Sequence, residues 1–218
     1  MSEFYTATQR NLQDRFDTRR MADLLTNAIV HTEIQDAERA FIESRDMFFL
    51  ATVDQSGQPT CSYKGGDPGL VTVVDATTLA FPIYDGNGMF LSLGNMQATA
   101  GVGLLFIDFE TPHRLRVQGR ASIREQDSLL ARYPGADLIV RVAVSRIFVN
   151  CSRYVHKYQR VASSRYVPRP GCDTPFAEWK RIDLVQEALP HRDTGKTERA
   201  GGTITLEDYA AKLAAGEA

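Results

Sequence analysis

Long apolar runs, a large excess of one charge sign and closely spaced cysteines are all missing from this chain of 218 residues. No apolar stretch approaches the roughly 20 residues that a membrane-spanning helix needs. The first residues also lack the basic start and apolar run of a signal peptide. A net charge of -2 gives no overall positive field that would attract nucleic acid or anionic lipid. We therefore expect a cytoplasmic globular protein with no membrane and no nucleic-acid partner.

The cysteines and histidines of the chain do not form a recognisable site. The three cysteines, Cys61, Cys151 and Cys172, are odd in number and far apart, which fits neither a disulfide framework nor a zinc site. The four histidines are too scattered for a ligand cluster, so we expect no metal. No Ser-His-Asp order is present either. Cys61 lies in a β-like run, and we expect it to be a small core residue without chemistry.

The N-terminal part of the chain, residues 1–46, has a helical pattern. Apolar residues recur at helical spacing from Asp17 to Ser44, which predicts two amphipathic helices. Thr32 followed by Gln35 resembles a capping box that would start the second helix.

From Met47 to Asn150 the chain consists of short β runs separated by turn residues. The runs are closely spaced and mostly linked as hairpins, whereas parallel strands need crossovers of a dozen or more residues. This favours an antiparallel barrel, so the predicted fold class is mainly β with flanking helices, and residues 47–150 form the barrel. The expected runs are Met47 to Val53, Thr60 to Lys64, Leu70 to Val74, Thr78 to Ile83, Val102 to Phe109, Arg114 to Ile123 and Leu138 to Val149.

Residues 151–218 begin with a basic and aromatic segment and continue into C-terminal helices, which we expect to pack on the same domain. Pro175 predicts a helix over residues 176–187. The charged and Gly-rich segment His191 to Gly202 is expected to be mobile. A final helix is expected to begin at Thr205, with Asp208 three residues later.

The turn around Asn87, which leads into a short helical stretch with Ser92 and Asn95, is the best candidate for an anion cradle. Amides at a helix N-terminus and short polar side chains suit a phosphate group. Ordinary capped turns use the same residues, and spacing alone favours that plainer interpretation. The strand that ends at Lys64 can supply the positive charge that such a cradle lacks.

A second candidate is the run from His113 to Arg120. Arg114, Arg116 and Arg120 fall on one strand face because strand side chains alternate with a period of two. Three arginines cannot form a core, and a solvated sheet face is the simplest interpretation, which we adopt for Arg120. For Arg114 and Arg116, a second interpretation is equally open. Their guanidinium groups could donate hydrogen bonds to a bound anion or to the electron-rich edge of a ring.

Four short motifs occur in the order Phe48 to Val53, Ser62 to Gly66, Gly103 to Phe106 and Arg114 to Gly119. Together they resemble the pyridoxamine 5'-phosphate oxidase-like flavoproteins. The resemblance covers about Met47 to Ile123 and implies a split β-barrel that binds FMN at the interface of a homodimer. It implies that Ser62 and Lys64 match the FMN-binding strand, that Ser92 and Asn95 lie on the phosphate-side helix, and that Arg114 lies where a polar residue contacts the flavin. The candidate cofactor-binding residues are Ser62, Tyr63, Lys64, Gly65, Asn87, Ser92, Asn95, Arg114 and Arg116.

The chain also departs from that family. Leu91 and Ser92 stand where true pyridoxamine-phosphate oxidases have an Arg-Lys pair, and their C-terminal Arg-Leu-His motif is missing. Pyridoxamine phosphate is therefore not the expected substrate. The basic and aromatic segment offers Tyr154, His156 and Lys157 as candidate substrate-binding residues.

The resulting hypothesis is an FMN-dependent oxidoreductase with a different small-molecule substrate, in which the flavin performs the chemistry and no nucleophile or metal is needed. One alternative is a non-catalytic flavin-binding module, since one fold hosts many functions. Another is a single-stranded nucleic-acid-binding barrel that uses the run Arg153 to Arg169, against which the overall acidity argues.

Overall fold

The computed structural model describes residues 4–218, which form two compact units. The first unit ends at Ala162, and the second comprises Ser163–Ala218. Within the described residues, no helix has the length and apolar character needed to cross a bilayer.

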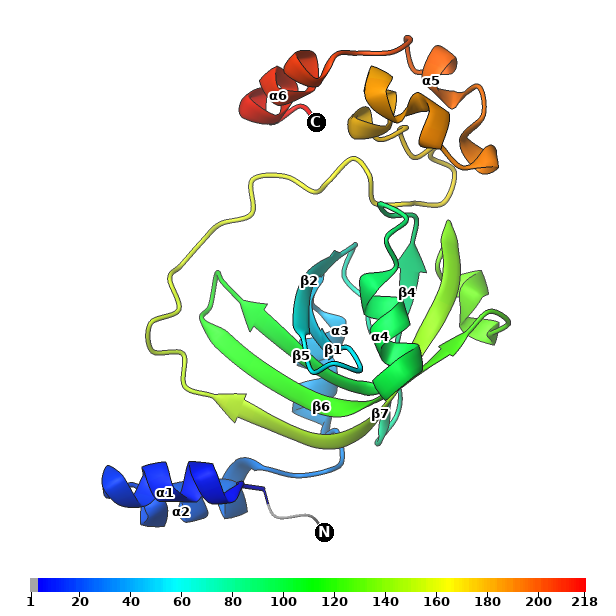
Figure 1. Cartoon of the computed structure of the whole chain (residues 1–218). Helices are drawn as coiled ribbons and strands as arrows, with labels where there is room; N and C mark the ends of the chain where they lie inside the picture. The colour runs from blue at the N-terminus through cyan, green and yellow to red at the C-terminus, as the bar shows by residue number, and fades with distance from the viewer. Residues whose placement is uncertain (1–3) are drawn as a thin grey trace. The chain divides into compact units, whose positions relative to one another are not determined.

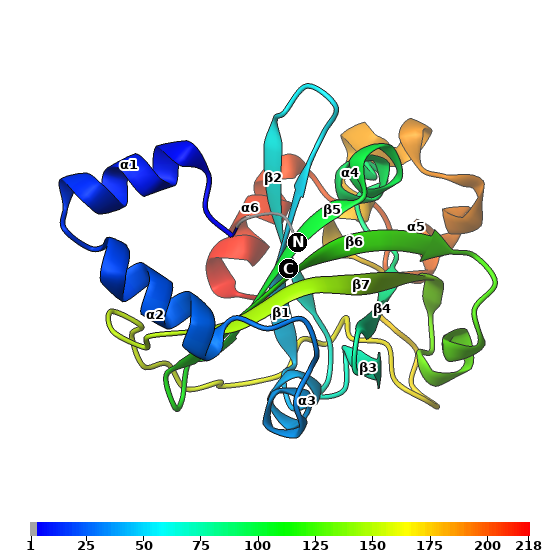
Figure 2. The ribbon, with the colours of Figure 1, turned by 90° about the horizontal axis from the view of Figure 1, so that it is seen from below.

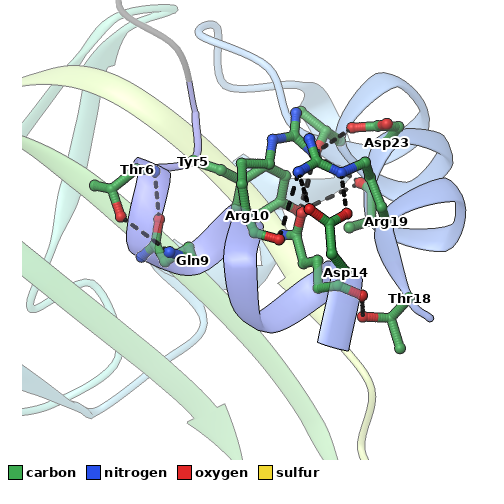
Figure 3. Close-up of polar contacts among 11 residues, drawn as sticks. Tyr5, Thr6, Gln9, Arg10, Asp14, Thr18, Arg19 and Asp23 are labelled. Carbon is green, nitrogen blue, oxygen red and sulfur yellow. Dashed lines mark hydrogen bonds and ion pairs between the residues drawn. The ribbon is translucent and has the colours of Figure 1, made fainter. Parts of the chain in front are cut away.

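A pair of polar helices begins the described chain. They are α1 (Ala7–Arg15) and α2 (Arg19–Ile29), and neither contains a buried residue. Arg10 of α1 forms an ion pair with Asp23 of α2, with 2.6 Å between the nitrogen and oxygen atoms (Figure 3). The two helices predicted between Asp17 and Ser44 are present, but a further helix, α1, precedes them. Helix α1 was missed since Leu12 is its one large apolar residue and no apolar stripe marks it.

The third helix, α3 (Asp36–Glu43), leads into the sheet. Its capping box is formed by Gln35 and Glu38, not by Thr32 and Gln35 as predicted. The helix begins later because the backbone of His31 is held in an extended bridge to the last strand of the sheet, with hydrogen bonds of 3.1 and 2.8 Å.

Seven strands form one sheet in the order β2-β1-β5-β6-β7-β4-β3, and the sheet curls round on itself (Figure 1). Every neighbouring pair of strands is antiparallel. The predicted fold class, mainly β with flanking helices, is therefore confirmed. The strands are β1 (Met47–Val53), β2 (Pro59–Gly65), β3 (Thr72–Asp75), β4 (Thr78–Tyr84), β5 (Gly101–Asp108), β6 (His113–Arg124) and β7 (Ala136–Asn150).

Alternate strand residues face a large apolar core inside the curled sheet, and a smaller apolar cluster contains Ala80, Tyr133 and Ile139. The ring centroid of Phe48, which is fully buried, lies 5.1 Å from that of Phe81 and 5.5 Å from that of Phe106. Burial of each such ring contributes about 1.5 to 3 kcal/mol. Helix α4 (Leu91–Thr99) packs against β1, β2 and β6 (Figure 2), and the 3₁₀ helix η1 (Ser128–Arg132) joins β6 to β7. The core thus fixes the edge strand β2 beside α4.

The second unit has ion pairs at its centre instead of a large apolar core. Within residues 163–218 the one buried apolar side chain is Ile182. Lys180, which is 4% exposed, donates a hydrogen bond of 2.7 Å to Asp193, and Lys196 donates one of 2.8 Å to the same carboxylate. The helices of this unit are η2 (Glu178–Arg181), η3 (Asp183–Ala188), η4 (His191–Asp193), α5 (Lys196–Arg199) and α6 (Leu206–Ala215).

Two predictions for this unit were wrong and one is confirmed. The helix expected over 176–187 is two 3₁₀ helices, because Ile182 leaves the helical conformation and forms a parallel bridge with Ile204. The segment His191 to Gly202, expected to be mobile, contains η4 and α5 and is held by the ion pairs to Asp193. The final helix does begin with a capping box of Thr205 and Asp208.

Candidate functional site

The strand β2 and the first turn of α4 bring two of the predicted residues together. The hydroxyl oxygens of Ser62 and Ser92 lie 3.3 Å apart. Ser62 pairs with Leu50 of β1, which is buried, so Ser62 lies on the face of the sheet that turns toward the core and α4. The two hydroxyl groups therefore line one small region at the edge of the barrel.

Lys64 lies two residues beyond Ser62, on the same face of β2. Its side chain is half-buried, and this burial lowers the pKa of the ammonium group below its ordinary value. Lys64 forms no hydrogen bond or ion pair with any residue in the range 4–218. A cation that is partly desolvated and unpaired gains stability from an anionic ligand.

The N-terminus of α4 adds backbone donors to the same region. Its N-cap residue, Phe90, has φ 50 and provides no side-chain cap, so the first amides of the helix keep their hydrogen-bonding capacity. The side chain of Asn87 accepts a hydrogen bond of 3.1 Å from the Met89 backbone N–H and so shapes the preceding turn. Uncapped amides at the positive end of a helix dipole favour an anion.

Asn95 ties α4 to the sheet. Its side chain is buried, and its Nδ2 donates hydrogen bonds to Thr52 at 3.1 Å and to Thr60 at 3.4 Å. The two threonine hydroxyls are themselves 2.9 Å apart. This network fixes the helix against β1 and β2, and thereby holds Ser92 near Ser62.

Arg114 and Arg116 lie on the outer face of β6. The predicted alternation is confirmed, since Leu115 and Val117 between and beside them are fully buried. A guanidinium nitrogen of Arg114 donates a hydrogen bond to the Cys151 carbonyl oxygen. Its Nε is buried and has no hydrogen-bond partner within the described chain. Arg114 is therefore partly buried and held at Cys151, whereas Arg120, further along β6, is exposed.

The predicted cofactor residues thus fall into two groups on opposite faces of the sheet. Ser62 and Lys64 are on the inner face, while Tyr63 points outward with Arg114 and Arg116. Gly65, which ends β2, lies beneath the Tyr63 ring. Three strand spacings separate β2 from β6, or about 14 Å at about 4.8 Å each. A single chain therefore does not bring the two groups together.

A hollow on the outer face was missed by the sequence analysis. It has a volume of about 430 Å³ and lies where β1 begins, where β2 ends and where β5 turns into β6. The chain segment of residues 158–162 forms its remaining wall. The signal that could have located it is the position of Tyr63, an aromatic residue on the exposed side of an edge strand.

The three predicted substrate-binding residues do not line this hollow. Tyr154, which is 87% exposed, and the exposed residues His156 and Lys157 precede the wall segment. Cys61, expected in the core, is exposed instead. The physical reason is its register, because Cys61 pairs with the exposed residue Ala51 and shares its outward face.

Comparison with known proteins identifies one family. A family model described as pyridoxamine 5'-phosphate oxidase matches residues 34–166. No curated protein sequence matches the chain.

Three solved structures resemble parts of the chain at low identity. A putative pyridoxamine 5'-phosphate oxidase from Lactobacillus delbrueckii is 22% identical, with 54% of this chain and 95% of that chain covered and a TM-score of 0.44. An FMN-binding protein from Syntrophomonas wolfei is 12% identical, with 66% and 98% covered and a TM-score of 0.41. The heme storage protein HutZ from Vibrio cholerae is 21% identical, with 53% and 94% covered and a TM-score of 0.40.

Proposed function

The chain belongs to the pyridoxamine 5'-phosphate oxidase family, and on this basis we propose that it is an FMN-dependent oxidoreductase that acts on a small molecule. The observation that carries the proposal is the contact between the hydroxyl groups of Ser62 and Ser92, beside the unpaired Lys64. Two hydroxyl groups, one ammonium group and the uncapped amides of α4 are a donor set that suits a phosphate. The residues at this edge of the barrel therefore fit the phosphate of FMN.

In this proposal Ser62, Ser92 and Lys64 hold the phosphate, and Asn95 keeps α4 in position for that contact. The partly exposed guanidinium group of Arg114 donates a hydrogen bond to the polar edge of the flavin ring. Bound FMN would supply hydride-transfer chemistry, for which the protein contributes binding, orientation and electrostatics. Because the family's Arg-Lys pair is replaced by Leu91 and Ser92, we propose a substrate other than pyridoxamine phosphate.

The separation of the two groups of residues supports a homodimer with FMN at its interface. The phosphate residues and Arg114 lie on opposite faces of the sheet, about three strand spacings apart. A twofold axis would bring the outer face of one protomer against the cradle of the other. We therefore propose that each flavin is held by the cradle of one protomer and by Arg114 of its partner.

The experiment that tests this function is the visible spectrum of the purified protein, followed by titration with FMN and with riboflavin. A flavin spectrum and tighter binding of FMN are expected, because the phosphate contacts are charge-assisted. A Soret band in place of the flavin bands, or equal affinity for both flavins, would refute the phosphate cradle. Reoxidation of NADH or NADPH by the loaded protein then separates an oxidoreductase from a module that only binds flavin.

A further inference from the structure

The hollow on the outer face contains none of the side chains that the proposed flavin site uses, although its lining residue Ile107 pairs with Arg114 across β5 and β6. Its volume of about 430 Å³ lies within the range of small-molecule sites, about 300 to 1,000 Å³. It is on the opposite face of β2 from the phosphate cradle, because Tyr63 alternates with Ser62 and Lys64. All its lining residues belong to the first unit, so the hollow is built within one compact part of the chain.

Three aromatic side chains line this hollow. The rings of Phe109 and Tyr158 meet edge to face, with 5.4 Å between their centroids. Tyr63 and Tyr158 remain 62% and 61% exposed. Tyr63 folds back over Gly65, where an added Cβ would lie 2.6 Å from a carbon of the tyrosine ring. Exposed rings around a concave surface suit a ligand with an apolar or aromatic body.

The charged side chains that line the hollow determine whether it favours a cationic or an anionic ligand. Arg45 pairs with Asp108 at 2.8 Å, and Arg160 pairs with Asp46, so both cations are already neutralised. The remaining carboxylate, Glu110, accepts a hydrogen bond of 3.4 Å from the Arg160 backbone N–H.

Glu110 has no ion-pair partner among residues 4–218. Two arginines against three carboxylates leave the hollow with one negative charge, which resides on this side chain. An anionic ligand would meet that charge with no free cation to offset it, whereas a cation would find a partner.

The wall of the hollow is held in place before any ligand binds. The Tyr158 backbone N–H donates to the Phe109 carbonyl oxygen at 3.1 Å. The Arg160 side chain reaches across to Asp46, next to the start of β1. These contacts pin the wall segment, residues 158–162, to the β5–β6 turn and to the sheet, so a ligand would not need to order it.

We propose that this hollow binds a small organic cation with an aromatic body, whose ring lies among Tyr63, Phe109 and Tyr158 and whose ammonium group pairs with Glu110. The aromatic rings would also stabilise the cation directly through their electron-rich faces.

The test is calorimetric titration of the full chain with phenethylamine, and with 3-phenylpropanoate as an anion of similar size. Phenethylamine should bind and 3-phenylpropanoate should not. Glu110→Gln should weaken phenethylamine by up to about fivefold, because it removes an ion pair at an exposed carboxylate. Glu125→Gln, the same change at an exposed residue outside the hollow, should leave binding unchanged.

A second pair of variants tests the aromatic wall. Tyr158→Ala should weaken phenethylamine strongly, while Tyr158→Phe, which keeps the ring, should bind as the unaltered protein does. Circular dichroism shows that each variant is folded. Absence of binding at millimolar phenethylamine, equal binding of 3-phenylpropanoate, or an unchanged affinity in Glu110→Gln would overturn the proposal. The same titration of Lys64→Met should be unaltered whatever that variant does to FMN, which keeps this outcome separate from that of the flavin site.

Discussion

The hydroxyl oxygens of Ser62 and Ser92 lie 3.3 Å apart, although 30 positions separate the two residues in the chain. Antiparallel pairing of β2 with β1 sets the position of Ser62, and the contact of Asn95 with two threonines sets that of Ser92. The half-buried Lys64 lies on the same face. The residues at this edge of the barrel are therefore positioned to bind a phosphate group.

Replacing Lys64 by methionine should weaken FMN by about 1.5 to 3 kcal/mol, the range for losing a hydrogen bond to a charged group. Riboflavin binding should change little, because riboflavin has no phosphate. Fluorescence titration with both flavins measures the difference. Lys212→Met, a change on α6 in the second unit, serves as the control and should alter neither affinity. Equal losses for FMN and riboflavin would show that Lys64 does not contact the phosphate.

FMN affinity should fall as the pH rises through the pKa of Lys64. Burial lowers the pKa of this ammonium group below 10.5, its ordinary value, and a bound phosphate favours the charged form. In the flavin-free protein the unfolded state binds the proton more tightly, so stability should rise with pH through that window. Bound FMN should reduce this rise of stability with pH, because its phosphate stabilises the protonated form of Lys64. Titrations between neutral pH and pH 10.5 measure the effect, and Lys64→Arg should abolish the loss of affinity because arginine stays charged.

Replacing Arg114 by alanine should weaken FMN and riboflavin alike, by about 1.5 to 3 kcal/mol if its hydrogen bond to the flavin ring is lost. His156→Ala should leave flavin bound, because His156 is exposed and far along the chain from the cradle. Flavin titration of the two variants, with circular dichroism to show that both are folded, is the measurement. If His156→Ala loses the flavin while Arg114→Ala keeps it, the proposed role of Arg114 is wrong.

The second unit should unfold when its central carboxylate is altered. Asp193→Asn removes the carboxylate charge that pairs with the buried Lys180, which should destabilise this unit by about 3 to 5 kcal/mol. Urea unfolding of the full chain, followed by the fluorescence of Trp179, reports on this unit. Asp173→Asn, a change at an exposed aspartate, should have little effect.

Acid should have a similar effect on the second unit. Burial opposes ionisation of Asp193, but the hydrogen bonds from Lys180 and Lys196 outweigh it and hold the pKa of the carboxyl below 3.8. A carboxylate with a lowered pKa contributes stability above its unfolded pKa, and this stability is lost as the pH falls through the folded pKa. Urea unfolding followed by Trp179 fluorescence should show lower stability of this unit below pH 3.8 than at neutral pH, and equal stability at both would contradict the prediction.

The sequence predicted those parts of the structure that depend on local periodicity. The alternation that places Arg114 and Arg116 on one face follows from a period of two, and the turn before α4 follows from its glycines. The missed features depend on contacts between distant segments. Ile182 leaves the helical conformation because Ile204 pairs with it, and the outer hollow exists because residues 158–162 return to the β5–β6 turn. A local sequence pattern does not predict such contacts between distant segments.

The most direct test of the proposed flavin site is complementation between two defective variants. Lys64→Met and Arg114→Ala should each bind FMN poorly alone. If each site combines the cradle of one protomer with Arg114 of its partner, mixed dimers contain one intact site. Random exchange of equal amounts should therefore restore tight FMN binding to about one quarter of the sites. Recovery of that fraction in an equilibrium titration is the result predicted here, and no recovery in a mixture shown by mass spectrometry to contain mixed dimers would contradict a shared site.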